Sequence, residues 1–515
     1  MTLFTKILTR AVELKKTIPK VGRKKDVLKI QQSALLKLLR KARNTSFGKE
    51  YDFDSIVFSK NPLSEFQKKV PVFDYQKIYD TWWSRLLNNE ENVCWPGKVK
   101  YFALSSGTSG ASSKYIPVTS QMLRSIKRAS ALHVLTLADY DIPVTFLEKG
   151  FLMIGGSTDL RSRGSYFEGD LSGITTGNIP FWFQEFYKPG KEISKEKDWN
   201  VKIEKIVENA KQWDIAIICG VPAWIQIVLQ KIITRYKVNN IHDIWPNLSV
   251  YVSGGVSFEP YRNGFGKLFA KPLIYLDTYL ASEGFMAFQA RPDTTSMQLI
   301  LNNGIFFEFV PFTSDNFDED GELLENPKVL LINEVEEGKE YALLISTNAG
   351  TWRYLIGDTV KFTSKEKSEI IITGRTKHFM SLCGEHLSVD NLNKAVTTAA
   401  NELNILITEF TLTGAPAKEG VFSHKWYVGT NSKIDGATLL KRIDQLLCEL
   451  NDDYAVERKE ALKEISISVL PLDIFYAWMR KNGKEGGQNK FPRVLKKEKQ
   501  EDWELFVKSA SIQNI

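Results

Sequence analysis

The sequence predicts an α/β protein with a large N-terminal domain and a smaller α+β domain after it. Between residues 101 and 290, short apolar runs alternate with amphipathic stretches, which is typical of strands and helices around a sheet with parallel strands. Beyond residue 299 the apolar runs are separated by acidic turns, which favours a small subdomain of antiparallel strands. Residues 376 to 515 show a further, self-contained set of helical and extended patterns. We therefore expect two domains, 1–375 and 376–515.

The early part of the chain is expected to start with helices and to continue as alternating strands and helices. Apolar periodicity predicts helices over 3–16, 26–43, 75–87, 120–140, 199–212 and 222–236, with another from residue 260. Apolar runs predict strands over 101–104, 151–154, 215–219, 248–252 and 273–276. Residues 157–192 lack a clear period, so we interpret them as a long irregular insertion.

Glycine-rich breaks follow four of these strands, after residues 104, 154, 219 and 252. In open α/β sheets, ligands bind at the carboxyl ends of the strands. The breaks are therefore expected to meet at one edge of the sheet and to form a binding site there.

The later part is expected to contain the antiparallel strands and then the small domain. Extended runs predict strands over 299–312, 328–334, 340–347 and 359–372. In the small domain, helices are predicted over 389–403 and 435–450, and strands over 406–413, 424–430 and 465–469. A charged, glycine-rich loop over 481–490 follows.

The composition is that of an ordinary globular protein with a sizeable core. Of the 515 residues, 43% are hydrophobic and 25% are charged. The net charge of +7 comes from the N-terminus, since residues 1–50 hold fourteen Lys and Arg against three acidic residues. A solvated basic helical surface accounts for this excess, so we expect no nucleic-acid partner.

The cysteines and histidines do not favour a disulfide framework or a zinc site. Cys94, Cys219, Cys383 and Cys448 lie far apart, and the five histidines show no ligand spacing. No apolar run is long enough to span a bilayer, and the N-terminus lacks the pattern of a signal peptide. These features together predict a cytoplasmic protein.

One polar stretch, Ser105-Ser106-Gly107-Thr108-Ser109-Gly110, follows the strand predicted over 101–104 and precedes a predicted helix. Glycines let the backbone come close to a ligand, and successive N–H groups and hydroxyls can donate to an anion. Lys114 adds a positive charge. Taken alone, the stretch fits either a phosphate-binding loop or an ordinary surface loop.

Four further motifs follow this stretch in order. They are Tyr279-Leu280-Ala281-Ser282-Glu283-Gly284, a stretch over 352–358 that ends in Gly357-Asp358, the junction over 374–386 that begins Gly374-Arg375, and Gly487-Gln488-Asn489-Lys490-Phe491-Pro492-Arg493. In this order they resemble the adenylate-forming enzymes. More closely, nearly the whole chain resembles the auxin-responsive acyl acid amido synthetase family of plants and its bacterial relatives.

The resemblance implies that the chain binds ATP and Mg²⁺. The residues that it implies for nucleotide binding are Ser105, Ser106, Gly107, Thr108, Ser109, Gly110, Lys114, Gly254, Gly255, Tyr279, Ala281, Ser282, Glu283, Asp358, Arg375 and Lys490. Glu283 is implied as the metal ligand and, with Lys490, as a catalytic residue. Tyr279 is expected to stack on adenine, Asp358 to accept the ribose hydroxyls, and Lys490 to reach the reacting carboxylate and the α-phosphate.

The resemblance also implies a reaction. A small carboxylic acid is expected to attack ATP, giving an acyl-adenylate and pyrophosphate, and an amine, such as that of an amino acid, is expected to take the acyl group. The small domain is then mobile, because Lys490 must close over the larger domain. Met153, Gly220 and Val221 are candidates for the acyl pocket, although each also fits plain core.

Two alternatives remain open from the residues. One is a ligase that forms a thioester with coenzyme A, and the other is a non-catalytic nucleotide-binding relative. Plant members that resemble this chain carry Arg two residues before the Gly of Gly-Asp, where this chain has Leu355, and Arg353 is displaced. The acid, the acceptor and the oligomeric state are not fixed by the sequence.

Overall fold

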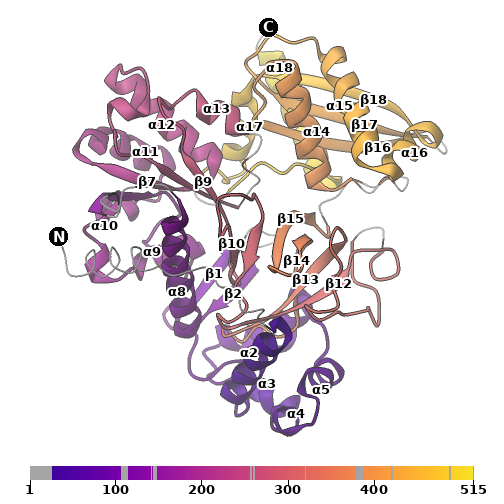
Figure 1. Cartoon of the computed structure of the whole chain (residues 1–515). Helices are drawn as coiled ribbons and strands as arrows, with labels where there is room; N and C mark the ends of the chain where they lie inside the picture. The colour runs from indigo at the N-terminus through magenta and orange to yellow at the C-terminus, as the bar shows by residue number, and fades with distance from the viewer. Residues whose placement is uncertain are drawn as a thin grey trace.

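The computed structural model describes residues 26–105, 114–140, 142, 146, 148–255, 258, 261–318, 321–377, 380, 382, 385, 387–418, 421–486 and 489–513. Within these residues the strands form sheets of 11, four and three members. Figure 1 shows the N-terminal helices at the bottom, the large sheet across the middle and the C-terminal unit above it. The helix expected over 3–16 lies outside the described residues.

The N-terminal helices form a compact group around aromatic side chains. The helices are α2 (Val27–Ala42), α3 (Ser46–Glu50), α4 (Phe53–Phe58), α5 (Pro62–Lys69), α6 (Tyr75–Ile78), η1 (Tyr79–Trp83) and α7 (Ser84–Leu87). Asp26 caps α2 by accepting from the backbone N–H of Lys29, and the Leu35 and Leu39 side chains are fully buried. The predicted helix over 75–87 is therefore present, with a π turn in its middle.

The polar stretch after residue 104 does not lead directly into a helix as expected. β1 (Tyr101–Ser105) pairs antiparallel with β2 (Lys114–Val118), and α8 (Ser120–Thr136) starts only after β2, capped by Thr119. These strands belong to a separate four-stranded sheet with β4 (Arg161–Ser162) and β5 (Phe167–Gly169). The break after 104 thus belongs to a hairpin, because the apolar run Tyr115–Val118 supplies a returning strand.

The parallel part of the large sheet contains the other predicted strand ends. β3 (Gly150–Met153), β7 (Ile215–Gly220), β8 (Val250–Gly254) and β9 (Ile274–Ala281) are consecutive parallel neighbours, with β6 (Tyr187–Lys188) at the edge. The helices α11 (Trp199–Asn209) and α12 (Pro222–Tyr236) pack beside them, and the short α13 (Arg262–Gly266) follows β8. The breaks after 154, 219 and 252 therefore lie at one edge, as predicted.

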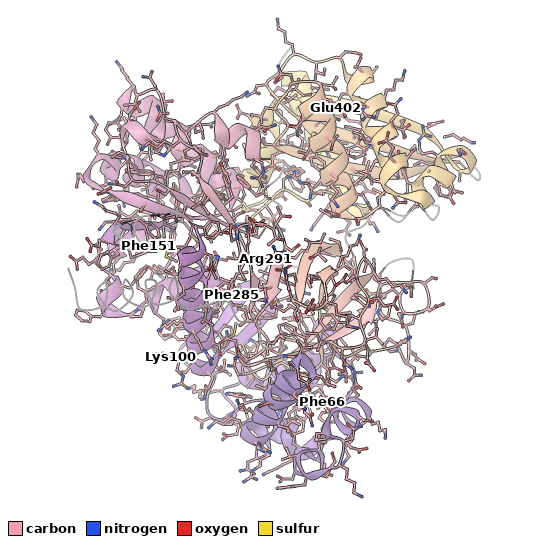
Figure 2. The ribbon with its side chains drawn as sticks, in the orientation of Figure 1. Phe66, Lys100, Phe151, Phe285, Arg291 and Glu402 are labelled. Carbon is pink, nitrogen blue, oxygen red and sulfur yellow. The ribbon has the colours of Figure 1, made fainter. Side chains whose placement is uncertain are left out.

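The antiparallel strands continue the same sheet and do not form a sheet of their own. They are β10 (Gly284–Phe288), β11 (Met297–Leu299), β12 (Ile305–Pro311), β13 (Glu340–Thr347), β14 (Tyr354–Ser364) and β15 (Glu369–Arg375). Phe285 on β10 belongs to the same core as Ile126 of α8. In Figure 2 the helix α8 lies beside the labelled Phe285.

Two local predictions were wrong. Residues 328–334 form no strand apart from a single bridge between Leu330 and Phe309, because the pairing is not continued on either side. Residues 157–192 are not wholly irregular, since they contain β4, β5, β6, α9 (Leu171–Gly177) and α10 (Lys191–Ser194). These elements are too short to give a periodic pattern.

The C-terminal unit has its own sheet and core. β16 (Glu409–Lys418) pairs antiparallel with β17 (Val421–Gly429), which pairs parallel with β18 (Leu462–Leu470). The helices α14 (Val389–Glu402), α15 (Gly436–Leu450) and α16 (Asp452–Glu460) accompany them. The helices α17 (Leu472–Lys481) and α18 (Lys497–Gln513), which the periodicity did not reveal, place Phe475 and Trp503 in one hydrophobic cluster with α11 and α12.

Candidate functional site

The predicted site residues gather where β8, β9, β14 and β15 approach the C-terminal segment. Asp358 on β14 lies opposite Arg375 on β15 in the strand register, and the Arg375 Nε lies 2.9 Å from Asp358 Oδ1. The Tyr279 hydroxyl on β9 donates to Asp358 Oδ2 at 2.6 Å. Both carboxylate oxygens of Asp358 are thus engaged, and its orientation is fixed by side chains from two other strands of the large sheet, β9 and β15.

Tyr279 is more deeply placed than expected for a residue that stacks on a ligand. Its side chain belongs to the main hydrophobic core and its relative exposure is 4%. Burial and the nearby Asp358 carboxylate raise the pKa of the Tyr279 hydroxyl, so it stays protonated and serves as a donor. The geometry shows a residue that orients Asp358.

Glu283 stands in the turn between β9 and β10 and is buried, with 6% of its surface exposed. Burial and, to a smaller extent, Asp358 raise the pKa of the Glu283 carboxyl to about 7, and Lys114 and Arg375 oppose that shift. At neutral pH the carboxyl group is therefore divided between its neutral and ionised forms. A cation beside it would favour the ionised form.

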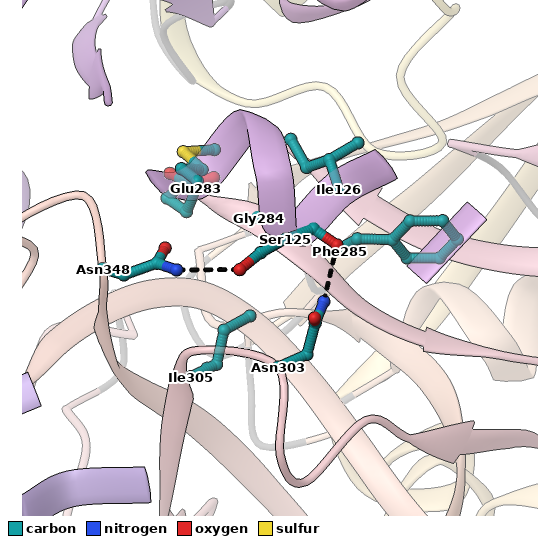
Figure 3. Close-up of a pocket in the computed structure, with 9 residues that line it drawn as sticks. Ser125, Ile126, Glu283, Gly284, Phe285, Asn303, Ile305 and Asn348 are labelled. Atoms are coloured by element: carbon teal, nitrogen blue, oxygen red, sulfur yellow. Dashed lines mark hydrogen bonds between the residues drawn. The ribbon is translucent and has the colours of Figure 1, made fainter. Parts of the chain in front are cut away.

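A small cavity lies against Glu283. Figure 3 shows Asn348 donating to Ser125 Oγ at 2.8 Å and Asn303 donating to the Ser125 backbone oxygen at 2.9 Å at this cavity. These contacts fix the wall formed by α8 and the loops after β11 and β13. The Asn303 Oδ1 is buried without a partner among the described residues.

Ser105 and Lys114 lie opposite each other as the last pair of the hairpin, where β1 leads into residues 106–113. The Lys114 ammonium lies 5.2 Å from the centre of the Tyr75 ring. Burial lowers the pKa of Lys114, and the Glu283 carboxylate opposes that shift, so the two groups lie within electrostatic reach of each other. The remaining predicted phosphate contacts, Ser106, Gly107, Thr108, Ser109 and Gly110, lie outside the described residues.

Lys490 comes from the C-terminal segment and reaches the end of β8. Its ammonium donates to the backbone oxygen of Gly255. Surrounding protein atoms and, to a smaller extent, Arg375 lower the pKa of Lys490 to about 8, while Asp358 opposes the shift; the residue as a whole is exposed. Lys490 thus lies near the pair of Asp358 and Arg375, although more than 100 residues of sequence separate it from either of them.

The backbone at the end of β8 is shaped for close approach. Gly255 has a φ of +85°, a conformation that other residues rarely adopt. A Cβ on Gly254 would lie 2.9 Å from the Thr278 Oγ1 of the neighbouring strand. The backbone conformation therefore favours glycine at 255, and a side chain at 254 would require Thr278 to shift.

The acyl-pocket candidates lie at neighbouring strand ends. Met153 pairs with Cys219, and Gly220 pairs with Ser253, which directly precedes the two glycines. Val221 is buried in the hydrophobic cluster around α12. The three candidates thus share the sheet edge, and the Val221 side chain serves the core.

Sequence reasoning missed two arrangements near the site. Tyr261, Glu409 and Arg493 form a buried hydrogen-bonded cluster, for which only Arg493 stood in a recognised motif. Arg353, displaced from the position that it has in plant members, is buried and binds Glu308 at 3.0 Å. Arg353 therefore joins the N-terminal helices to the sheet, since it also donates to the backbone oxygen of Val70.

Three further observations concern the described part of the chain. In the described part of the chain, no group of three or more His, Cys, Asp or Glu is placed to hold a metal ion by protein ligands alone. Across the same ranges, no helix is long and apolar enough to cross a membrane. A cleft of about 830 Å³ between α5 and residues 322–329 is lined by none of the predicted site residues.

Comparison with known proteins gives a consistent result along the chain. Three family models match in order: the GH3 family N-terminal domain over residues 22–203, the GH3 family central domain over residues 298–371, and the GH3 family C-terminal domain over residues 390–499. The chain is 24% identical over 464 residues to the indole-3-acetic acid-amido synthetase GH3.4 of Arabidopsis thaliana, covering 76% of this chain and 74% of that one. It is 23% identical over 445 residues to GH3.2 of the same plant, covering 72% and 78%.

Solved structures show the same fold. The GH3.15 acyl acid amido synthetase superposes with a TM-score of 0.75 at 16% identity, over 97% of this chain and 96% of that one. A 2-hydroxyisobutyryl-CoA ligase in its postadenylation state gives a TM-score of 0.58 at 12% identity, over 98% and 94%. The α/β fold class predicted from the sequence, with its large N-terminal and smaller C-terminal units, is thereby confirmed.

Proposed function

Since the chain belongs to the GH3 family, as the resemblance of its motifs to the acyl acid amido synthetases indicated, we propose that it joins a small carboxylic acid to an amino acid at the cost of ATP. The observation that carries this proposal is the position of Lys490. Its ammonium contacts the backbone at the end of β8, beside the pair of Asp358 and Arg375. A cation from a distant segment is thereby available at a site whose other groups suit a nucleotide.

The proposed reaction has two steps. In the first, a carboxylate oxygen of the acid attacks the α-phosphorus of ATP, and the bond from that phosphorus to the bridging oxygen breaks, which releases pyrophosphate. In the second, the amine of an amino acid attacks the acyl carbon, the bond to AMP breaks, and the amine proton passes to solvent. An amide and AMP result.

We assign nucleotide contacts to the residues around the sheet edge. Asp358 accepts the ribose hydroxyls, because its carboxylate is held by Tyr279 and Arg375. Ser105 to Gly110, with Lys114, hold the phosphates. The remaining assigned contacts border the adenosine: Gly254, Gly255, Ala281 and Ser282. Tyr279 acts indirectly, by orienting Asp358.

Glu283 suits a magnesium ion that also binds phosphates. Mg²⁺ takes oxygen ligands and is commonly held by one or two carboxylates together with substrate phosphates. The raised pKa of Glu283, about 7, fits such a site, because its burial leaves the carboxylate without full compensation. When bound, the ion neutralises charge on the phosphates. In this proposal the Glu283 carboxylate holds the ion near Lys114, so that both positive charges face the phosphates.

Lys490 is assigned to the first step. Its ammonium stabilises the charge that develops between the carboxylate and the α-phosphate. We place the acyl group along Met153, Gly220 and Val221, at the neighbouring strand ends. Residues 1–375 and 376–515 form the two domains in this proposal, and the second moves to admit the amine.

Pyrophosphate exchange tests the proposal. The protein is incubated with ATP, Mg²⁺, labelled pyrophosphate and a panel of small carboxylic acids, and acid-dependent return of label into ATP is expected. No exchange with any acid of a broad panel would reject adenylation and favour a non-catalytic relative. Mass spectrometry after addition of amino acids or coenzyme A separates an amide from a thioester, and a thioester alone would reject the amido synthetase.

A further inference from the structure

A buried polar cluster joins the two units close to Lys490. Tyr261, just before α13 in the large unit, donates its hydroxyl to Glu409 Oε1 at 2.8 Å. Glu409 opens β16 of the C-terminal unit, and its Oε2 accepts from Arg493 Nη1 at 2.8 Å. Tyr261 is 2% exposed, and the Glu409 and Arg493 side chains are 3% and 9% exposed.

Arg493 is fixed to β16 on several sides. Its guanidinium donates to the backbone oxygens of Thr408 at 3.1 Å and Phe410 at 3.3 Å, and lies 4.4 Å from the centre of the Phe410 ring. The backbone oxygen of Arg493 accepts from Leu412 N at 2.9 Å. The segment that contains Lys490 therefore takes its position from β16.

The contact between Tyr261 and Glu409 crosses from one unit to the other, whereas the pair of Glu409 and Arg493 lies within the C-terminal unit. A buried carboxylate needs its donors, because desolvation of the charge is costly. Burial raises the pKa of Glu409 while Arg493 opposes that shift. The Tyr261 hydroxyl thus links the large unit to the buried ion pair of Glu409 and Arg493. It is one of the donors that offset the cost of burying the Glu409 carboxylate.

A second contact fixes the chain on the N-terminal side of Lys490. The Trp224 Nε1 on α12 donates to the backbone oxygen of Asn489 at 2.8 Å. Gly486 lies so close to Trp199 that an added Cβ would be 2.1 Å from the indole. Lys490 is therefore located between an anchor on α12 and the cluster at Tyr261.

We propose that Tyr261 is a positioning residue, which holds β16 and the attached segment 489–495 in the place where Lys490 reaches the oxygen of Gly255. We assign Tyr261 no contact with ATP or with the acid, since its hydroxyl is engaged by Glu409 and Arg493. It acts through Glu409 and Arg493, and the catalytic part of the inference rests on the proposed function.

The substitution Tyr261→Phe tests this inference, because it removes the hydroxyl and leaves the ring. Tyr236→Phe is the matched control, since the Tyr236 hydroxyl donates to the backbone oxygens of Val207 and Glu208 within the large unit. The first readout needs no activity. The pH dependence of Lys490 modification by formaldehyde and cyanoborohydride is followed by mass spectrometry.

In the wild type and in Tyr236→Phe, Lys490 is expected to titrate near 8. In Tyr261→Phe the midpoint should rise toward the ordinary value of about 10.4, because the ammonium moves away from the protein groups, Arg375 among them, that lower its pKa. An unchanged midpoint in Tyr261→Phe overturns the inference, whatever the enzyme activity is. If Tyr261→Phe does not fold, Trp224→Phe removes the anchor at Asn489 and should raise the midpoint in the same direction, and an unchanged midpoint there also overturns it.

The second readout is acid-dependent pyrophosphate exchange. Tyr261→Phe should lower kcat by about tenfold to a hundredfold with the KM for ATP within about twofold, as expected for a misplaced catalytic group. In a Lys490→Ala background the same substitution should change the rate less than about twofold. Equal losses in both backgrounds would show a general structural defect and overturn the inference. A wild type without exchange rejects the proposed function, while the Lys490 titration still decides the positioning role.

Discussion

Tyr279 and Arg375 each hold one oxygen of the Asp358 carboxylate. The Tyr279 hydroxyl donates to Oδ2 at 2.6 Å and the Arg375 Nε lies 2.9 Å from Oδ1. Tyr279 comes from β9 and Arg375 from β15, so strands from distant parts of the chain fix the direction in which Asp358 faces the site. The following substitutions test this site and its supports.

Asp358→Asn should weaken ATP binding by about tenfold to a hundredfold, because hydrogen bonds between a charged acceptor and the ribose hydroxyls are lost. Isothermal titration calorimetry measures the Kd. Asp390→Asn is the control, since Asp390 pairs with Lys394 on the surface of α14. Equal Kd values for Asp358→Asn and the wild type would remove Asp358 from the nucleotide site.

Lys490→Ala should lower pyrophosphate exchange by about a hundredfold or more, which is the scale for loss of one electrostatic contact to a transition state. ATP binding should remain within a fewfold, because Asp358 and the phosphate contacts are untouched. Lys484→Ala, in the same glycine-rich loop, serves as the control. Exchange at the wild-type rate in Lys490→Ala would exclude Lys490 from the reaction.

The stability of the protein should depend on the ionisation of Glu283. Its pKa is about 7 in the folded chain and close to 4.5 when unfolded, so the folded state binds the extra proton between these values. The free energy of unfolding contributed by this group is therefore fully present below about pH 4.5 and is lost as the pH rises through 7.

Urea unfolding of the wild type and Glu283→Gln between pH 5 and pH 8, without Mg²⁺, measures this effect. The wild type should lose stability relative to Glu283→Gln as the pH rises, since Gln carries no proton to lose. Parallel curves would show that Glu283 is ionised throughout. Added Mg²⁺ should stabilise the wild type more at pH 8 than at pH 5, because the cation binds the ionised carboxylate.

Arg353→Ala should destabilise the protein by about 3–5 kcal/mol, because it leaves the buried Glu308 carboxylate without its partner. Arg442→Ala is the control: Arg442 pairs with Glu402, labelled on the C-terminal unit in Figure 2, at the surface. That loss should be about 1 kcal/mol or less. Urea unfolding midpoints compare the two variants, and similar losses would mean that Arg353 is not structurally required.

Local patterns were sufficient to predict much of the fold. Continuous apolar runs identified β7 and β8, because strands buried on both faces carry few polar residues. Apolar periodicity identified α8 and α12. The order of the motifs, which no single motif supplies, indicated the family and drew attention to Glu283, Asp358 and Lys490.

What could not be predicted depends on contacts between distant segments. The return of β2 after the polar stretch is a pairing with β1, and periodicity does not report pairing. Tyr261 gave no signal because its partner Glu409 lies 148 residues away. The hydrogen bond between the Tyr279 hydroxyl and Asp358 was likewise invisible, since Tyr279 was expected either to stack on adenine or to pack in the core.

The two units share one hydrophobic cluster, in which Phe475 and Trp503 lie with Trp199 and Trp224. Separating the units exposes aromatic surface on both, and hydrophobic free energy scales with the apolar area exposed. The large unit on its own therefore exposes a hydrophobic surface beside α12, to which other chains can bind. The consequence concerns synthesis of the chain. The helices α11 and α12 leave the ribosome long before α17 and α18, so the nascent protein carries a surface prone to aggregation until α17 and α18 are made.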